Sequence, residues 1–309
     1  MKFTVEYPVA SAGETPELVG PEGMIRVVKA AEQHGYDAVA FTEHPAPSLK
    51  WLEAGGHQSL DLTSALSFCA AVTERVRLMT YLMVLPYHNP FVAAKALATV
   101  DRLSAGRVTV VAGSGYLRSE FLALNVDMEV RNELFDEGLE VMRGAWSEVP
   151  YSHEGKHFRG KGVASLPGPV QPGGPPVLIG GNSAMSRRRA ASAQGWSPLM
   201  VSEEVARTTR TPALATIEQL ATRIEEVREA AVEQQGEGTG ITIQVQTPEC
   251  TFLQAPGSVE QHREHLGQLA GAGVDSFVLQ PPGERVERCV EALQEYAETF
   301  LGVSSGGRR

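Results

Sequence analysis

Cysteine is scarce in this sequence of 309 residues. Cys69, Cys250 and Cys289 are its only three, and they lie far apart in apolar surroundings. None has the paired spacing that metal sites and redox motifs use. We therefore expect reduced thiols in the core, no metal site, and a cytoplasmic location.

An excess of positive charge is also missing. The formal net charge is −10, and no stretch concentrates lysine and arginine along one face. Proteins that bind nucleic acid usually carry an excess of positive charge, so we expect no nucleic-acid partner. No apolar run is long enough to cross a bilayer, and the first residues, MKFTVEYPVA, carry no cationic leader. The sequence therefore predicts no membrane partner either.

Alternating strand and helix patterns are what the sequence does contain. The clearest unit has an apolar strand over 76–84, a helix over 91–103 and a second apolar strand over 108–112. Asn89 is placed to cap this helix. A strand, a crossover helix and a second strand form a parallel βαβ unit, whose functional groups gather at the carboxyl ends of the strands.

The same alternation predicts eight strands in all. The remaining strands are expected at residues 2–9, 37–42, 177–180, 196–201, 241–247 and 276–280. Eight strands alternating with helices fit an α/β fold of one TIM barrel better than a doubly wound open sheet. The open sheet is the fallback because the strand at 196–201 is weak. We expect the barrel over 1–302, an inserted excursion with a small hairpin at about 150–176 before the fifth strand, and a disordered tail at 303–309.

Polar residues follow several of the predicted strands. They are Glu43 and His44, Tyr87 and His88, Ser114 and Tyr116, Gly181 to Ser183, and Gln280. His44 precedes Pro45, which holds it extended, and an imidazole there suits proton transfer near neutral pH. The alternative is an ordinary strand-end histidine hydrogen-bonded to a carboxylate.

The turn Gly180-Gly181-Asn182-Ser183 allows two interpretations. Glycines let backbone N–H groups approach a ligand, and a helix that begins here favours an anion. Alternatively, the turn is only tight, and Asn182 or Ser183 caps the helix. The residues themselves leave both open. His262 and His265, three apart on a later helix, are expected on a solvated face rather than at a metal site.

Three longer runs combine these motifs in a fixed order: AEQHGYDAVAFTEH (31–44), TERVRLMTYLMVLPYHNPFVAAKALATVDRLSAGRVTVVAGSGYLRSEFLAL (73–124) and PVQPGGPPVLIGGNS (169–183). The combination resembles the bacterial-luciferase-like family of flavin and deazaflavin oxidoreductases. That resemblance implies a TIM barrel with a planar tricyclic cofactor at its mouth, either the deazaflavin F420 or FMN. The run W-L-x-x-G-G-H at 51–57 is more similar to the F420 branch.

The resemblance also implies roles for individual residues. Glu43 and His44 would lie near the ring, with His44 handling the proton that accompanies hydride transfer. The implied cofactor contacts are Tyr81 and Leu82, at a non-proline cis peptide under the ring, Ser114 and Tyr116 at the linker, and Gly180, Gly181 and Asn182 at the phosphate. Sugar-phosphate dehydrogenases of the family carry glutamate where Tyr116 stands, so that activity is not expected here.

Three functions compete at this point. The leading one is an F420-dependent oxidoreductase that moves a hydride between the deazaflavin and a small organic substrate. The alternative is an FMN-dependent two-component monooxygenase, whose lid the 46–60 loop and the excursion would form. A non-catalytic carrier of a flavin-like ligand is the third. By resemblance we also expect a homodimer and a separate reductase that supplies reduced cofactor.

Overall fold

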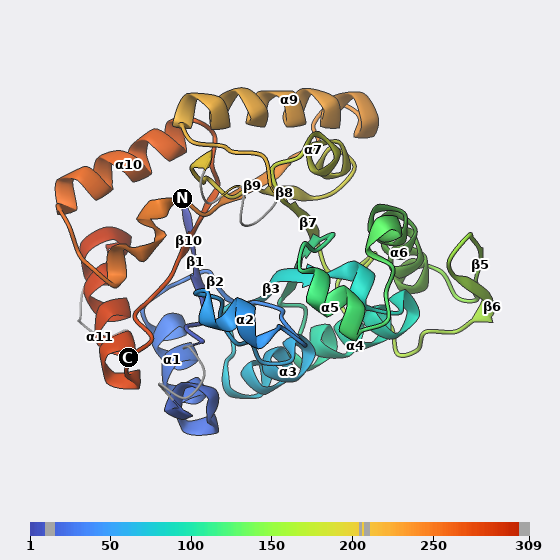
Figure 1. The fold of residues 1–309 in the computed structure, drawn as a ribbon, viewed down its shortest axis with the longest axis horizontal. Helices are drawn as coiled ribbons and strands as arrows, with labels where there is room; N and C mark the ends of the chain where they lie inside the picture. The colour runs from blue at the N-terminus through green and yellow to red at the C-terminus, as the bar shows by residue number, and fades with distance from the viewer. Residues whose placement is uncertain (10–15, 204–205, 207–210, 303–309) are drawn as a thin grey trace. The chain divides into compact units, whose positions relative to one another are not determined.

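The structure is a computed structural model that describes residues 1–9, 16–203, 206 and 211–302. Within these residues eight strands form a closed barrel in the order β1-β10-β9-β8-β7-β4-β3-β2 (Figure 1). The barrel strands are β1 (Lys2–Glu6), β2 (Ala38–Phe41), β3 (Arg77–Val84), β4 (Val108–Gly113), β7 (Val177–Gly180), β8 (Gly195–Ser197), β9 (Thr242–Val245) and β10 (Ser276–Leu279). The predicted TIM barrel is confirmed, and the open sheet is wrong. The expected disordered tail, 303–309, lies outside the described residues.

Helices follow the strands as the sequence pattern predicts. The α-helices are α1 (Pro21–Gln33), α2 (Leu49–Glu53), α3 (Leu62–Val72), α4 (Pro90–Leu103), α5 (Arg118–Ala123), α6 (Arg131–Ser147), α7 (Ala184–Ala190), α9 (Ile217–Gln235), α10 (Val259–Gly271) and α11 (Val286–Tyr296). Short helical turns are η1 (Pro16–Val19), η2 (Leu85–Tyr87), η3 (Met128–Val130), η4 (Pro248–Leu253) and η5 (Ala297–Leu301). In the described part of the chain, no helix is both long and apolar enough to cross a membrane.

Side-chain caps fix the starts of two helices in the second unit, and the one at Asn89 is the cap expected from the sequence. The Asp61 carboxylate accepts the Ser64 N–H at 2.8 Å, and the Asn89 side chain accepts the Phe91 N–H at 3.0 Å. Each bond satisfies an N–H group that a helix would otherwise leave unpaired at its first turn. The caps therefore determine where α3 and α4 begin.

Two local predictions need correction. The strand expected at 196–201 ends at Ser197, and Leu199 and Val201 form only isolated bridges. Pro198 explains this, because it has no N–H to donate to a neighbouring strand. The loop at 46–60 contains the short helix α2, which the sequence pattern did not indicate.

The chain forms two compact units. The first comprises Met1–Ala40, Arg75–Arg77 and the described residues from Val177 onward, and the second comprises Phe41–Glu74 and Leu78–Pro176. The predicted excursion lies in the second unit as an antiparallel hairpin of β5 (Tyr151–Glu154) and β6 (Arg159–Val163), and it packs beside α6 (Figure 1).

Side chains on the strands of the first unit alternate between two environments. Phe3 on β1 packs against Tyr296 of α11 with ring centres 5.8 Å apart, and Phe277 on β10 packs against His262 of α10. Successive side chains of a strand point to opposite faces, so the alternate positions face away from these helices, toward the barrel interior.

The interior-facing positions of the first unit are polar and hydrogen-bonded to one another. The Gln244 amide donates to the Thr4 hydroxyl at 3.1 Å, and the Ser197 hydroxyl donates to Gln244 Oε1 at 3.2 Å. The hydroxyls of Thr4 and Ser276 are 3.3 Å apart. This mutual pairing offsets the cost of burying four polar side chains.

The expected solvated face of α10 is wrong for His262. This side chain is 1% exposed, its Nε2 lies 2.9 Å from the Tyr296 hydroxyl, and its ring stacks on Phe252. The reason is that α10 presents His262 to η4 and α11. His265 is half-buried, with Nε2 3.0 Å from the Thr247 hydroxyl. Within the described residues, no group of three or more His, Cys, Asp or Glu side chains could hold a metal ion.

Within the second unit, Asp101 of α4 is hydrogen-bonded to the end of the excursion. This fully buried carboxylate accepts the backbone N–H groups of Val170 at 2.8 Å and Gln171 at 3.0 Å, and also the Gln171 amide at 2.7 Å. Arg102 adds a bond to the Gly168 carbonyl at 3.0 Å. Asp101, the first residue of the sequence D-R-L-S-A-G-R at 101–107, therefore fixes the path of the chain that leads into β7.

We expect Asp101→Ala to lower the free energy of unfolding by about 3 kcal/mol, because three N–H donors lose a charged acceptor. Glu154→Ala removes an exposed carboxylate from the same unit and is expected to change the free energy of unfolding by less than about 0.5 kcal/mol. Urea denaturation of both variants checks this. Equal losses of unfolding free energy in the two variants would show that Asp101 does not hold the end of the excursion in place.

Candidate functional site

His44, which follows β2, is paired with a buried carboxylate in the second unit. Its Nδ1 lies 3.2 Å from Oε2 of Glu120 on α5, and the two side chains are 10% and 1% exposed. The backbone N–H of His44 donates to the Ser59 hydroxyl at 2.8 Å. The imidazole is therefore fixed through both its ring and its backbone.

Glu120 accepts three hydrogen bonds, from the loop after β2 and from η2. Besides His44, the backbone N–H of Ala46 donates to Oε1 at 3.2 Å, and the Tyr87 hydroxyl donates to Oε2 at 3.1 Å. An ionised carboxylate has no hydrogen to donate, so His44 must carry its proton on Nδ1. The neutral ring then has its basic lone pair on Nε2, which has no protein partner among the described residues.

Aromatic rings surround His44. Ring centres lie 4.5 Å away for Trp51, 4.9 Å for His57 and 6.2 Å for Tyr116. Burial lowers the pKa of His57, while burial and then the Glu120 charge raise the pKa of Tyr116 to about 12. Near neutral pH, His57 is therefore uncharged and Tyr116 keeps its hydroxyl proton. That hydroxyl has no hydrogen-bond partner within the described part of the chain.

Glu43, predicted to be catalytic with His44, has protein partners on both oxygens. Oε2 accepts the Val84 N–H at 2.5 Å, and Oε1 lies 2.7 Å from Nε2 of His88. The side chain is 8% exposed. Glu43 thus links the end of β3 to His88 in the turn that follows. Its role in catalysis stays a prediction.

The peptide bond between Tyr81 and Leu82 is cis, as the family resemblance implied. The register of β3 with β4 shifts between Thr80 and Met83, so this pair lies at a bulge. Leu82 packs on Gly113 so closely that a Cβ added there would lie 2.7 Å from Leu82 Cδ1. The first glycine of the G-x-G-Y motif therefore makes room for the bulge.

The rest of that motif forms a sharp turn. Gly115 has φ +75°, and a Cβ there would lie 2.6 Å from Val84 Cγ1. Only glycine meets both conditions without strain. Ser114 and Tyr116 flank this glycine and are partly exposed, so both remain available to a ligand.

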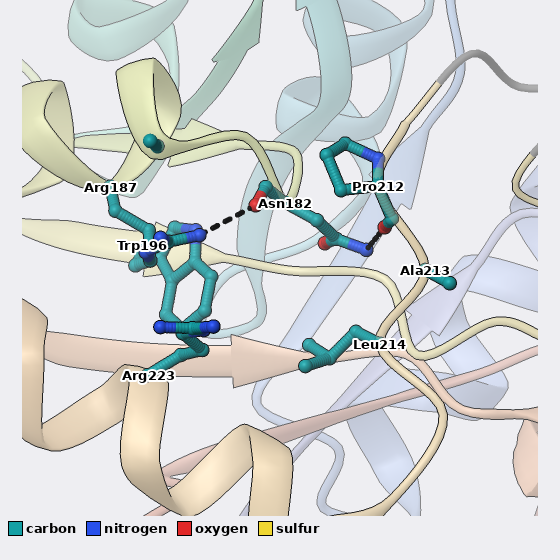
Figure 2. A pocket seen from close by; sticks show the side chains of 8 residues that line it. Asn182, Arg187, Trp196, Pro212, Ala213, Leu214 and Arg223 are labelled. Carbon is teal, nitrogen blue, oxygen red and sulfur yellow. Dashed lines mark hydrogen bonds between the residues drawn. The ribbon is translucent and has the colours of Figure 1, made fainter.

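In the first unit, Asn182 connects the turn after β7 to two other segments. Its side-chain amide donates to the Pro212 carbonyl at 2.9 Å (Figure 2). The same amide donates to the Leu199 carbonyl at 2.7 Å, and its Oδ1 accepts the Leu199 N–H at 2.9 Å. The residue is 3% exposed. Asn182 is therefore a structural connector, and the helix cap is Ser183, whose hydroxyl accepts the Ser186 N–H at 3.0 Å.

The backbone N–H groups predicted to hold an anion already have acceptors. The Gly181 N–H donates to the Ser197 carbonyl at 3.2 Å, and the Asn182 N–H donates to the Thr211 hydroxyl at 3.2 Å. Of the two interpretations of this turn, the local hydrogen bonds match the structural one. An anion contact with Gly180, Gly181 or Asn182 remains a prediction.

A pocket of about 220 Å³ lies beside Asn182 (Figure 2). Its lining includes Trp196 and the guanidinium groups of Arg187 and Arg223. Arg187 donates to the Asn182 carbonyl at 2.8 Å, and both arginines pair with Glu226 of α9. Two cations share one carboxylate, so the surplus of positive charge suits an anionic group.

Sequence reasoning missed Glu120, the acceptor that orients His44. Its only signal in the sequence is a carboxylate placed directly before the buried Phe121, four residues after Tyr116. It also could not place Trp51 and His57, which lie against His44.

Residues 1–248 match the model of a family described as luciferase-like monooxygenase. The F420-dependent glucose-6-phosphate dehydrogenase of Rhodococcus erythropolis is 31% identical over 182 residues, which cover 57% of this chain and 52% of that protein. The FMNH2-dependent dimethylsulfone monooxygenase of Pseudomonas putida is 29% identical over 143 residues, covering 45% and 38%. The chain thus spans about half the length, or less, of these curated relatives.

Among solved structures, monooxygenase RslO1 from Streptomyces bottropensis is similar over nearly the whole chain. The TM-score is 0.77, with 98% of this chain and 99% of that one covered. The sequences are 23% identical, so the likeness concerns the fold. It agrees with the closed barrel described above.

We expect Glu120→Gln to change the tautomer of His44, because an amide can donate to Nδ1 as well as accept from it. In the wild type, nitrogen NMR shifts of the imidazole are expected to show hydrogen on Nδ1 alone, and in the variant a mixture. The matched control Glu129→Gln alters an exposed carboxylate and is expected to leave the shifts unchanged. A single unchanged tautomer in Glu120→Gln would contradict this pairing.

Asn182→Ala is expected to cost about 2–4 kcal/mol of folding stability, because buried backbone groups of two segments lose their partner. Ser183→Ala removes only a helix cap and should cost about 1 kcal/mol. Denaturant unfolding measures both. If Asn182→Ala costs no more than Ser183→Ala, the connector role is wrong.

Proposed function

This chain belongs to the luciferase-like monooxygenase family, and on that premise we propose that it is an F420-dependent oxidoreductase acting on a small organic substrate. The observation that carries the proposal is the His44–Glu120 pair, which leaves the basic Nε2 of a largely buried imidazole without a protein partner among the residues that the structure describes. Named relatives use F420 or FMN, so the family supports a flavin or deazaflavin. F420 is our choice because the 51–57 run resembles the F420 branch.

The residues around His44 suit a flat ring with polar edges. Trp51 and His57 present aromatic surfaces, and the Tyr116 hydroxyl is an unused donor in the described structure. Ligand pockets commonly combine apolar walls with a few polar atoms that fix orientation. We assign the ring contacts to Tyr81 and Leu82, and the linker contacts to Ser114 and Tyr116.

In this proposal His44 carries the proton and Glu120 stabilises its charged form. Bound F420 would supply a two-electron hydride acceptor or donor. When a substrate hydroxyl is oxidised, His44 Nε2 takes the hydroxyl proton, and in the reverse reaction it returns that proton to the oxygen. Glu120 keeps Nδ1 protonated and balances the positive charge of the imidazolium, which is otherwise costly in a buried position.

The proposal also covers the cofactor's phosphate. We assign it to the turn of Gly180, Gly181 and Asn182, with the charge supplied by Arg187 and Arg223 at the neighbouring pocket. The arginines are needed because the N–H groups of Gly181 and Asn182 already donate to protein acceptors. A homodimer, a reductase that supplies reduced cofactor, and a cytoplasmic location complete the proposal.

An FMN-dependent monooxygenase is the second candidate, favoured by the similarity to an FMNH2-dependent relative. It would require a pocket shielded from water. Oxygen uptake that depends on substrate, measured with supplied reduced FMN, distinguishes this candidate from the first.

Titration of the purified protein with F420 and with FMN tests the choice of cofactor. We expect saturable F420 binding, followed by fluorescence, and weaker binding of FMN. Tight FMN binding without F420 binding removes the leading proposal and leaves the second candidate.

His44→Ala is expected to slow hydride transfer by about 100-fold or more, because a positioned general base contributes that much. Binding of F420 should change by less than about threefold, since the lost interaction concerns the proton. Stopped-flow measurement with a small alcohol or ketone that the wild type accepts provides the rate. His34→Ala, at the end of α1, is the matched control. Unchanged turnover in His44→Ala would move the catalytic centre elsewhere.

A further inference from the structure

Three polar side chains at the carboxyl ends of neighbouring strands have no role in the proposed function. Glu6 ends β1, Gln246 follows β9 and Gln280 follows β10. Each lies two residues beyond an interior-facing position, namely Thr4, Gln244 and Val278. Side chains two residues apart on a strand share a face, so these three form the next interior layer of the first unit.

One oxygen of Glu6 is fully engaged within this layer. Oε2 accepts the Gln246 amide N–H at 2.7 Å and the Gln280 amide N–H at 3.1 Å. The Gln280 amide is oriented by Cys250 of η4, whose thiol donates to its Oε1 at 3.5 Å. Burial raises the pKa of Cys250 to about 12, so this thiol keeps its proton and remains a donor.

The other oxygen of Glu6 is open. Oε1 has no hydrogen bond among the described residues, and the residue is partly exposed. A carboxyl oxygen left without a partner inside a barrel mouth is the arrangement expected of a group that contacts a ligand.

The proton of this carboxyl has one favourable position. Burial raises the pKa of Glu6, opposed by the hydrogen bonds from Gln280 and Gln246, which are uncharged. Because Oε2 accepts two N–H bonds, the proton of the neutral acid lies on Oε1. In its neutral form Glu6 therefore presents an O–H donor, where the ionised carboxylate could only accept.

We propose that Glu6 binds the oxygen of an uncharged carbonyl compound, a ketone or an aldehyde, by donating a hydrogen bond from Oε1–H. A carbonyl oxygen accepts and does not donate, which matches a neutral acid held by two amides. The amides carry no positive charge, so the cluster disfavours a carboxylate or phosphate ligand. This binding site goes beyond the proposed function and does not depend on the cofactor.

The test uses the full chain without cofactor and cyclohexanone as the probe, with cyclohexanecarboxylate as the anionic comparison. Infrared spectra follow the carbonyl stretch of the bound ketone and the carboxylic-acid band of Glu6, while NMR titration gives the dissociation constant. We expect cyclohexanone to bind, its carbonyl stretch to shift on binding, and the carboxylate to bind at least about tenfold more weakly.

The pH dependence separates the donor from a general apolar contact. Ketone binding is expected to be strongest where Glu6 is neutral and to weaken as pH rises and the Glu6 acid band disappears, up to about tenfold per pH unit. Glu6→Gln keeps an uncharged donor, so it should bind within about threefold of the low-pH wild type at every pH. Cys250, the neighbouring titratable group, stays neutral throughout this range.

Two further variants test whether Glu6 itself binds the ketone. Glu6→Ala should weaken ketone binding about fivefold through the loss of one hydrogen bond. Glu17→Gln, at an exposed glutamate of the same unit, should leave it unchanged. Equal binding by the wild type, Glu6→Gln and Glu6→Ala at all pH values overturns the proposal, as does the absence of cyclohexanone binding to the wild type. Neither outcome bears on F420 binding or on His44.

Discussion

The candidate site of the second unit depends on one buried carboxylate. Glu120 is fully enclosed, and a charge in that position is tolerated only where hydrogen-bond donors surround it. Its donors are His44 and Ala46, in the loop that follows β2, and Tyr87 in the turn η2. Satisfying one charge therefore fixes two chain segments against α5 and selects the tautomer of His44. The orientation of His44 and the local stability of this unit therefore have the same physical cause.

Two other buried carboxylates connect segments of the second unit in a similar way. Glu43 accepts from the end of β3 and lies next to His88, and Asp101 accepts from the chain that leads into β7. Each carboxylate accepts backbone N–H groups that no strand or helix satisfies. These hydrogen bonds give Glu43 and Asp101 structural roles that need no contact with a ligand.

The sequence predicted those parts of the molecule that local patterns determine. Period-two and helical spacing predicted the barrel, and the short polar side chain before the helix over 91–103 predicted the cap at Asn89. It did not predict the pairing of His44 with Glu120, because 76 residues separate them and no local pattern relates the end of β2 to the distant helix α5. His262 was misplaced for a similar reason: whether a helix face meets solvent or a neighbouring helix depends on tertiary contacts.

The glycine turn after β7 shows why a motif alone leaves its role undecided. An N–H group at such a turn can donate to a ligand or to the protein, and the residues are the same in both cases. Here the acceptors are the Ser197 carbonyl and the Thr211 hydroxyl, while Asn182 uses its side chain to join two further segments. An anion at this turn would have to replace those acceptors or bind through Arg187 and Arg223. The second route leaves the internal hydrogen bonds intact, so charge rather than backbone donors would govern any phosphate affinity in the first unit.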